Sequence, residues 1–162
     1  MNEEYEYSFK VKSVNDFIKY CEENHYKIVE EYKQVRTLYK NGGKVMARIT
    51  TNTYNDKKVS ILNFKDDNLN SSPLKISRES EDLVITKENK KFVDSLIQIL
   101  DLTNIKIFKR KRIVFKKKNV VFEIDKYISP RMNVVAIEGK KEEVDQVYSS
   151  LESIILKNKI DE

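Results

Sequence analysis

Residues 105–139 read IKIFKRKRIVFKKKNVVFEIDKYISPRMNVVAIEG, and this stretch decides the fold. It contains three closely spaced runs rich in β-branched and aromatic residues, at 105–115, 120–127 and 133–139. Runs of this length and composition are typical of strands, and connections of only a few residues suit antiparallel neighbours. The stretch therefore predicts three consecutive strands of an antiparallel sheet.

Five further strands are predicted before this stretch. Residues 4–11 alternate charged or polar with apolar residues, which is the period of a strand with one buried face. Strand-like runs follow at 26–39, 45–51, 59–65 and 74–85, with Asn41-Gly42-Gly43 as a hairpin turn and 66–73 as a polar loop. Eight strands with few connections that could cross over predict an α+β protein built on a closed eight-stranded antiparallel β-barrel.

Three amphipathic segments predict helices that flank this barrel. The first follows Ser13, the second follows Thr86, and the last covers residues 144–155. No linker is long enough to separate two domains, so residues 1–157 are predicted to form one domain and 158–162 a polar tail.

Composition excludes several classes of protein. The chain has 162 residues, a net charge of +5 and interleaved acidic and basic residues, which does not favour a general nucleic-acid binder. Cys21 is the single cysteine, so no internal disulfide forms, and a reducing, cytoplasmic location is expected. No apolar run approaches the roughly 18 residues that a membrane span needs.

The polar faces of the predicted strands carry charges of both signs. They comprise Glu4, Glu6, Arg48, Lys65, Glu79, Glu81, Arg110, Arg112, Glu123, Asp125 and Glu138. If the apolar faces pack on helices, these charges point into the barrel, where they need water, a polyanion or metal to be tolerated. Clustered arginine and lysine suit phosphate oxygens, and clustered carboxylates suit Mg²⁺ or Mn²⁺. The alternative is an ordinary sheet whose solvated outer face carries cross-strand ion pairs.

Several segments resemble motifs of the CYTH, or triphosphate tunnel metalloenzyme, superfamily, in the order in which that family has them. EYEYSFKV resembles its opening ExExK strand, VMARIT its LRIR segment and ILNFK its LTYK segment. KISRESEDLVI resembles an R-x-E-x-E strand, and KRKRIVF, VVFEIDKY and VVAIEG resemble the closing strands. The resemblance covers nearly the whole chain and implies a divergent relative of class IV adenylyl cyclases and thiamine triphosphatases.

The chain departs from the family pattern at three places. Ser8 stands at the lysine of ExExK, although Lys10 lies one step along on the same face. Thr50 replaces the second arginine of LRIR, and Ala136 replaces the first glutamate of E-I-E. These departures affect the expected catalytic rate and leave the expected fold unchanged.

The resemblance implies a role for each remaining charge. It assigns phosphate binding to Arg48, Lys65, Arg110 and Arg112, and catalysis to Glu4, Glu6 and Lys10. It assigns binding of Mg²⁺ or Mn²⁺ to Glu4, Glu6, Glu81, Asp125 and Glu138. The implied activity is metal-dependent hydrolysis of a triphosphate, either inorganic tripolyphosphate or an organic triphosphate, inside the barrel.

Other functions stay open at this point. A class IV-type adenylyl cyclase would make cyclic AMP from ATP, but the sequence has no motif for adenine recognition. The three departures favour a non-catalytic module that binds triphosphate or polyphosphate. Nucleic-acid binding through residues 109–118 lacks stacking residues other than Phe108 and Phe115. Homodimerisation is likewise open.

Overall fold

The computed structural model describes residues 2–43, 45–70, 74–128 and 131–160. Its strands are β1 (Asn2–Val11), β2 (Lys27–Lys40), β3 (Val45–Tyr54), β4 (Lys57–Asn70), β5 (Leu74–Glu79), β6 (Leu83–Val84), β7 (Asn104–Lys117), β8 (Val120–Tyr127) and β9 (Met132–Gly139). Its helices are α1 (Asn15–Glu23), α2 (Lys90–Ile99), α3 (Lys141–Ser150) and α4 (Glu152–Asn158).

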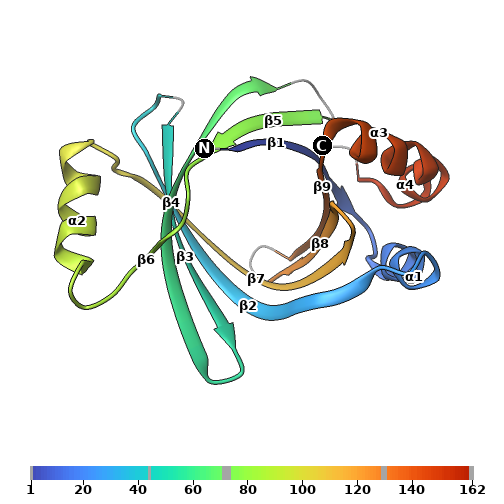
Figure 1. Cartoon of the computed structure of the whole chain (residues 1–162), viewed down its shortest axis with the longest axis horizontal. Coiled ribbons are helices and arrows are strands. Elements are labelled where there is room, and N and C mark those ends of the chain that lie inside the picture. The colour runs from blue at the N-terminus through green and yellow to red at the C-terminus, as the bar shows by residue number, and fades with distance from the viewer. Residues whose placement is uncertain (1, 44, 71–73, 129–130, 161–162) are drawn as a thin grey trace.

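Eight of the strands form a closed antiparallel barrel, as predicted (Figure 1). The neighbours run in the order β3, β2, β7, β8, β9, β1, β5 and β4, and β4 pairs with β3 to close the ring. The two-residue β6 pairs only with β4 and lies outside the ring order. A closed ring leaves no free edge among its eight strands, so each of them has a partner on both sides.

The predicted strand at 74–85 is wrong in its length. β5 ends at Glu79, where the Ser80 backbone N–H donates to the Phe64 carbonyl and the Ser80 hydroxyl accepts from the Phe64 N–H. These bonds hold Ser80 against β4, and after the irregular residues 80–82 the chain pairs with β4 again as β6, so the predicted strand is interrupted at 80–82. The predicted loop at 66–73 is also wrong in part, because β4 continues to Asn70 and pairs there with β5. Residues 71–73 lie outside the described part of the chain.

The described chain has four helices, one more than predicted. The expected last helix is interrupted at Leu151, which separates α3 from α4. The second helix begins at Lys90 instead of directly after Thr86. Thr86 forms a turn with Asn89, in which each residue's side-chain oxygen accepts a hydrogen bond from the other's backbone N–H. None of the helices in the described ranges has both the length and the apolar character needed to cross a bilayer.

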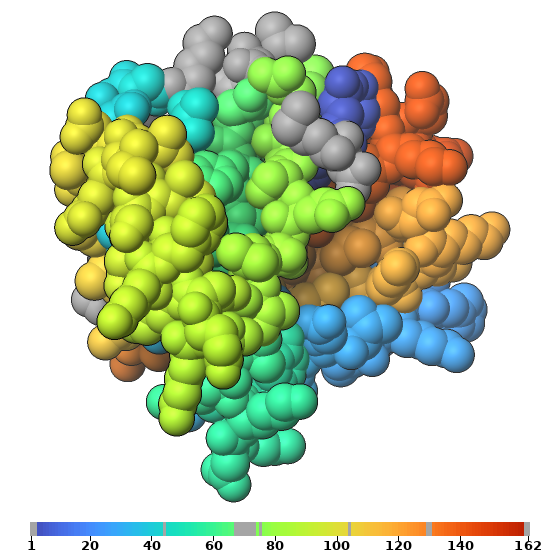
Figure 2. All heavy atoms as spheres, turned by 60° about the vertical axis from the view of Figure 1, so that its left-hand side comes forward, coloured from blue at the N-terminus to red at the C-terminus, as the bar shows by residue number. Residues whose placement is uncertain are grey.

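The hydrophobic core lies outside the ring, between the strands and the helices. The larger cluster includes Phe9, Phe17, Phe122 and Leu151, and joins α1, α3 and α4 to β1, β8 and β9. The smaller cluster includes Val93 and places α2 against β3 and β4 (Figures 1 and 2). Because alternate residues of a strand face opposite sides, this packing turns the polar residues of the same strands into the barrel.

The predicted polar tail does not hang free over its first residues. The Lys12 N–H donates to the Asn158 carbonyl at 2.8 Å, and the Ile160 N–H donates to the Lys10 carbonyl at 3.0 Å. Asn158 is buried, and its amide donates to Asp16 at 3.0 Å. Residues 158–160 therefore extend along the end of β1, held by the same backbone bonding that forms the sheet.

Candidate functional site

A cavity of about 350 Å³ lies inside the barrel, and charged side chains dominate its lining. Seven carboxylates line it: Glu4, Glu6, Glu79, Asp82, Glu123, Asp125 and Glu138. Five cations line it: Arg36, Arg48, Lys65, Arg110 and Arg112. The inward alternation expected from the sequence thus brings most of the predicted site residues into one cavity.

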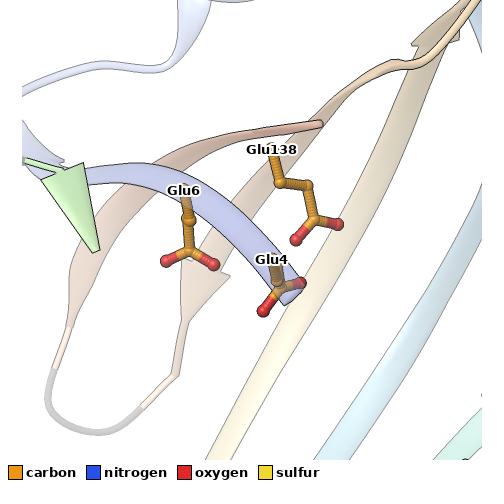
Figure 3. Close-up of side chains that lie close together, drawn as sticks. All are labelled: Glu4, Glu6 and Glu138. Carbon is orange, nitrogen blue, oxygen red and sulfur yellow. The ribbon is translucent and has the colours of Figure 1, made fainter. Parts of the chain in front are cut away.

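Three of the carboxylates converge on one point. Glu4 and Glu6 project from β1 and Glu138 from β9, where Glu6 and Glu138 are paired across the strands (Figure 3). One oxygen from each of the three lies within 4.8 Å of the others. Three carboxylate oxygens at this spacing form the donor set that Mg²⁺ and Mn²⁺ prefer, so these residues fit a divalent cation.

The carboxylates of Glu138 and Glu4 share a hydrogen bond that needs one proton. Burial, the Glu123 charge and the contact with Glu4 raise the pKa of Glu138 to about 10. Burial acts against ionisation of Glu4 as well, but the bond from Glu138 and the Lys65 ammonium lower the pKa of Glu4 on balance. Without a cation, the cluster therefore holds a proton at neutral pH, and a bound cation would displace it.

Arg112 and Arg110 occupy another part of the lining, around Asp125. Arg112 donates to both oxygens of Asp125, at 2.7 and 2.8 Å, and also pairs with Glu123. Arg110 lies 3.1 Å from Asp125 and donates to Gln34 at 2.6 Å. Its Nη2 atom is buried and has no hydrogen-bond partner among the described residues. Asp125 thus holds two arginines, and the acidic cluster that fits a metal forms without it.

Arg36 on β2 is a cavity cation that the family motifs do not indicate. Its Nε donates to the Thr50 hydroxyl at 3.1 Å, and it makes no ion pair with a carboxylate in the described ranges. Burial, together with Arg48, Arg110 and Arg112, lowers the pKa of Arg36 to about 9, so it stays charged at neutral pH. Gln34 and Arg36 are two residues apart on β2 and therefore lie on the same face of the strand. This polar alternation is the signal in the sequence that indicates that both side chains face the bore.

Arg36 places a cation beside Thr50, where the resemblance noted in the sequence implies an arginine. Thr50 stands at the second arginine of LRIR, and Arg36 is its direct cross-strand partner on β2. The guanidinium therefore enters the bore from the neighbouring strand, at the same level of the barrel.

Lys65 and Arg48 are linked through Glu79. Lys65 lies 3.0 Å from Glu4 and 3.3 Å from Glu79, and Arg48 pairs with Glu79 and donates to Asn63 at 3.0 Å. Glu79 therefore faces the bore. Its neighbour Arg78 faces outward and pairs with Asp66 at 2.7 Å, which settles the register of this strand.

The structure does not bring Glu81 or Lys10 to the cavity lining. Glu81 is exposed in the irregular segment between β5 and β6, where the regular alternation of the strand is interrupted. Lys10 is half-buried further along β1, while Ser8 lines the cavity. Ser8 faces Ala136 directly across β1 and β9, so two departures from the family pattern form one uncharged patch.

A larger hollow, of about 630 Å³, adjoins the acidic cluster. It shares Glu4, Glu79 and Glu138 with the bore and is otherwise lined by residues such as Tyr5, Lys140 and Lys141. Two residues of the acidic cluster, Glu4 and Glu138, therefore line both the hollow and the bore.

Comparison with known proteins gives the fold. No protein-family model matches the sequence, and neither does any curated protein. Among solved structures, a conserved hypothetical protein of Pyrococcus furiosus is similar with a TM-score of 0.70 and 21% identity, over 92% of this chain and 90% of that one. The PH1012 protein of Pyrococcus horikoshii has a TM-score of 0.70 and 16% identity, over 94% and 87%.

The adenylyl cyclase-like HpAC1 protein of Hippeastrum, described with a dominant triphosphatase activity, has a TM-score of 0.64 and 13% identity. That similarity covers 98% of this chain and 90% of HpAC1. At these identities the comparisons establish a shared fold: the chain has the closed barrel of these proteins, with charges inside it.

Proposed function

We propose that this protein hydrolyses a triphosphate inside the barrel, with Mg²⁺ or Mn²⁺ held by Glu4, Glu6 and Glu138. The observation that carries the proposal is an unsatisfied buried donor in the same cavity as the carboxylate cluster. Arg110 Nη2 is buried without a hydrogen-bond partner among the described residues, and Arg36, which donates to Thr50, makes no ion pair with a carboxylate there. A buried guanidinium N–H without an acceptor favours an anionic ligand, and phosphate oxygens suit its geometry.

The charge balance of the cavity supports a requirement for metal. Seven carboxylates and five cations line it, so the cavity is not positive overall. A triphosphate brings several further negative charges, and placing them beside Glu4, Glu6 and Glu138 is unfavourable without a divalent cation. When bound there, the cation would neutralise charge that develops on the phosphate in the transition state.

Different residues of the cavity bind the phosphate groups and orient the attacking water. Arg36, Arg48, Arg110 and Arg112 bind the phosphate oxygens, and Lys65 bridges them to the carboxylates through Glu4 and Glu79. A carboxylate of the acidic cluster orients the attacking water in line with the bond to be broken. The triphosphatase activity described for HpAC1, which shares the fold, supports this type of reaction.

Binding without turnover is the second candidate, and the Ser8–Ala136 patch favours it. These two residues face each other in the bore and carry no charge, where the family pattern has a lysine and a glutamate. The protein could then hold a triphosphate through its arginines without the full catalytic set.

One assay separates the candidates. Phosphate release is measured from tripolyphosphate, ATP and thiamine triphosphate with Mg²⁺ or Mn²⁺, and cyclic AMP is measured in the ATP reaction. The proposal expects metal-dependent phosphate release that Glu6→Gln abolishes and that Lys91→Gln, on the exposed face of α2, leaves unchanged. Binding of these ligands without release would favour the second candidate, and cyclic AMP as the main product would indicate a cyclase.

A further inference from the structure

A row of lysines crosses the outer wall of the barrel, away from the bore. Lys33 on β2 is paired with Lys111 on β7, and Lys111 with Lys126 on β8. On the other side Lys33 faces Thr53 of β3, which faces Lys58 of β4. Their neighbours along the strands, Gln34, Arg110, Arg112 and Asp125, are buried around the bore, so the lysines point outward.

These lysines have no acidic partner. All four are exposed, and none makes an ion pair in the described part of the chain. Like charges directly opposite one another on neighbouring strands destabilise a sheet. A row of this kind lowers stability unless an anionic partner compensates for it.

The row borders a groove of about 500 Å³ on the outside of the barrel. Lys33, Lys111 and Lys126 line it together with Ile113 and Ile124, and Glu31 is the single carboxylate among its described lining residues. Tyr32 and Arg112 border it as well, and Arg112 also lines the bore. The β3–β4 hairpin, which contributes Thr53 and Asn55, projects beside it and can be followed at the bottom of Figures 1 and 2. The groove thus combines a cationic rim with aliphatic side chains.

The adjoining surface is aliphatic as well. In the next row Val35 faces Lys109, and Ile107 and Ile128 lie close by. Val35, Ile107 and Ile128 are 39%, 59% and 54% exposed. The surface therefore matches a ligand that carries both carboxylates and apolar side chains.

The shape and chemistry of this surface favour one class of anionic partner over the others. Tyr32 is the one aromatic residue among the described residues that line the groove, and its ring packs against Tyr54 with centroids 5.0 Å apart, so nucleic-acid bases would lack a free stacking platform. The groove is concave, whereas a bilayer surface is flat on this scale. β2, β7 and β8 are paired on both sides, so a partner must contact side chains and cannot add a strand.

We propose that this groove binds an acidic segment of a partner protein that also carries aliphatic residues. Its carboxylates would pair with Lys33, Lys111 and Lys126, and its aliphatic side chains would cover Ile113 and the exposed residues of the next row. The opposing like charges would be compensated only in the complex. The proposed contacts use outward-facing lysines and aliphatic residues, whereas the triphosphate chemistry uses side chains of the bore; Arg112 borders both spaces.

The test is fluorescence anisotropy with a labelled peptide of glutamate and leucine in equal numbers. A glutamate–serine peptide of equal charge measures the contribution of the aliphatic residues. We expect the leucine peptide to bind more tightly, and Lys33→Glu with Lys111→Glu to weaken it by about tenfold or more, because like charges then face each other. Lys91→Glu on α2 is the matched control and should leave binding unchanged.

The melting temperature and tripolyphosphate hydrolysis of each variant show whether the barrel and its bore are intact. If the double variant does not fold, Lys126→Gln alone should weaken the leucine peptide without changing hydrolysis. Equal binding of the two peptides, or binding insensitive to these lysines, would overturn the proposal. Preferential binding to a single-stranded RNA or to phosphatidylserine vesicles would overturn it in favour of that partner.

Discussion

At the scale of single residues, Arg36 is the side chain whose contacts are least explained by the protein alone. It donates to Thr50 and has no carboxylate partner in the described ranges. We expect Arg36→Gln to weaken tripolyphosphate binding roughly ten- to a hundredfold, the usual size of one lost charge-assisted contact. Isothermal titration with and without Mn²⁺ measures this. Arg78→Gln, on the outside of β5, is the control, and an equal loss there would contradict the assignment.

The Ser8–Ala136 patch gives a second residue-scale prediction. Ser8→Lys supplies the cation that the family pattern has, but it faces Ala136 and lacks a carboxylate opposite. We expect a small gain in phosphate release for Ser8→Lys and a larger one when Ala136→Glu is added, since the pair restores both charges. The gain should need Glu6, so adding Glu6→Gln should abolish it. A double variant no faster than the natural protein would show that this patch does not limit the rate.

The raised pKa of Glu138 predicts a pH dependence of stability. In the unfolded chain this carboxyl loses its proton near 4.5, whereas in the fold it holds it to about 10. The folded state then binds more protons in this window, so the free energy of unfolding falls as pH rises from about 4.5 to 10. Glu4 has a lowered pKa, and its contribution is lost only at lower pH.

Glu138→Gln should remove this decrease in the free energy of unfolding at high pH. Relative to the natural protein, its melting temperature should rise by a few degrees on going from pH 5 to pH 9. With Mn²⁺ the natural protein should instead have the higher melting temperature, because only the natural protein keeps all three ligands. A difference that does not change with pH in the metal-free protein would refute the shared proton.

At the scale of elements, the meeting of β8 and β9 positions the acidic cluster. Gly139 follows Glu138 with a φ of +154°, and an added Cβ would lie 2.7 Å from the Asn119 carbonyl oxygen. Backbone cannot yield as a flexible side chain does, so Gly139→Ala should shift the end of β9 and with it Glu138. We expect weaker Mn²⁺ binding with tripolyphosphate affinity less affected. Gly42→Ala, which meets no atom within 4 Å, separates this effect from glycine replacement at positive φ in general.

At the scale of the whole molecule, the closed ring couples ligand binding to folding, because only the folded barrel has the cavity. Residues of all eight barrel strands line the cavity, and it exists only when the ring is closed. Tripolyphosphate at about a hundred times its Kd should therefore raise the melting temperature by roughly 5–10 °C, and more with Mn²⁺ or Mg²⁺. Differential scanning fluorimetry measures this. An unchanged transition at millimolar ligand would contradict any function for the bore.

The sequence by itself determined the strands and which face of each is polar. Alternation along residues 4–11 and 105–127 is a local property, because neighbouring side chains of a strand face opposite sides. It therefore predicted the barrel and the inward direction of Arg48, Lys65, Arg110 and Arg112, whereas the grouping of Glu4, Glu6 and Glu138 as metal ligands came from the family resemblance. Strand ends were less certain, since Ser80 ends β5 only through its bonds to Phe64 on another strand.

Only the tertiary structure decided which charges meet. Asp125 holds Arg110 and Arg112, Arg36 stands opposite Thr50, and Ser8 opposite Ala136. Each pairing depends on strand register: in the β2–β3 and β7–β8 hairpins the turn geometry fixes it, whereas Ser8 and Ala136 come from opposite ends of the chain and meet only when the ring closes. The same register aligned Lys33, Lys111 and Lys126 on the outer wall, where the sequence alone showed only separate lysines in alternating strands.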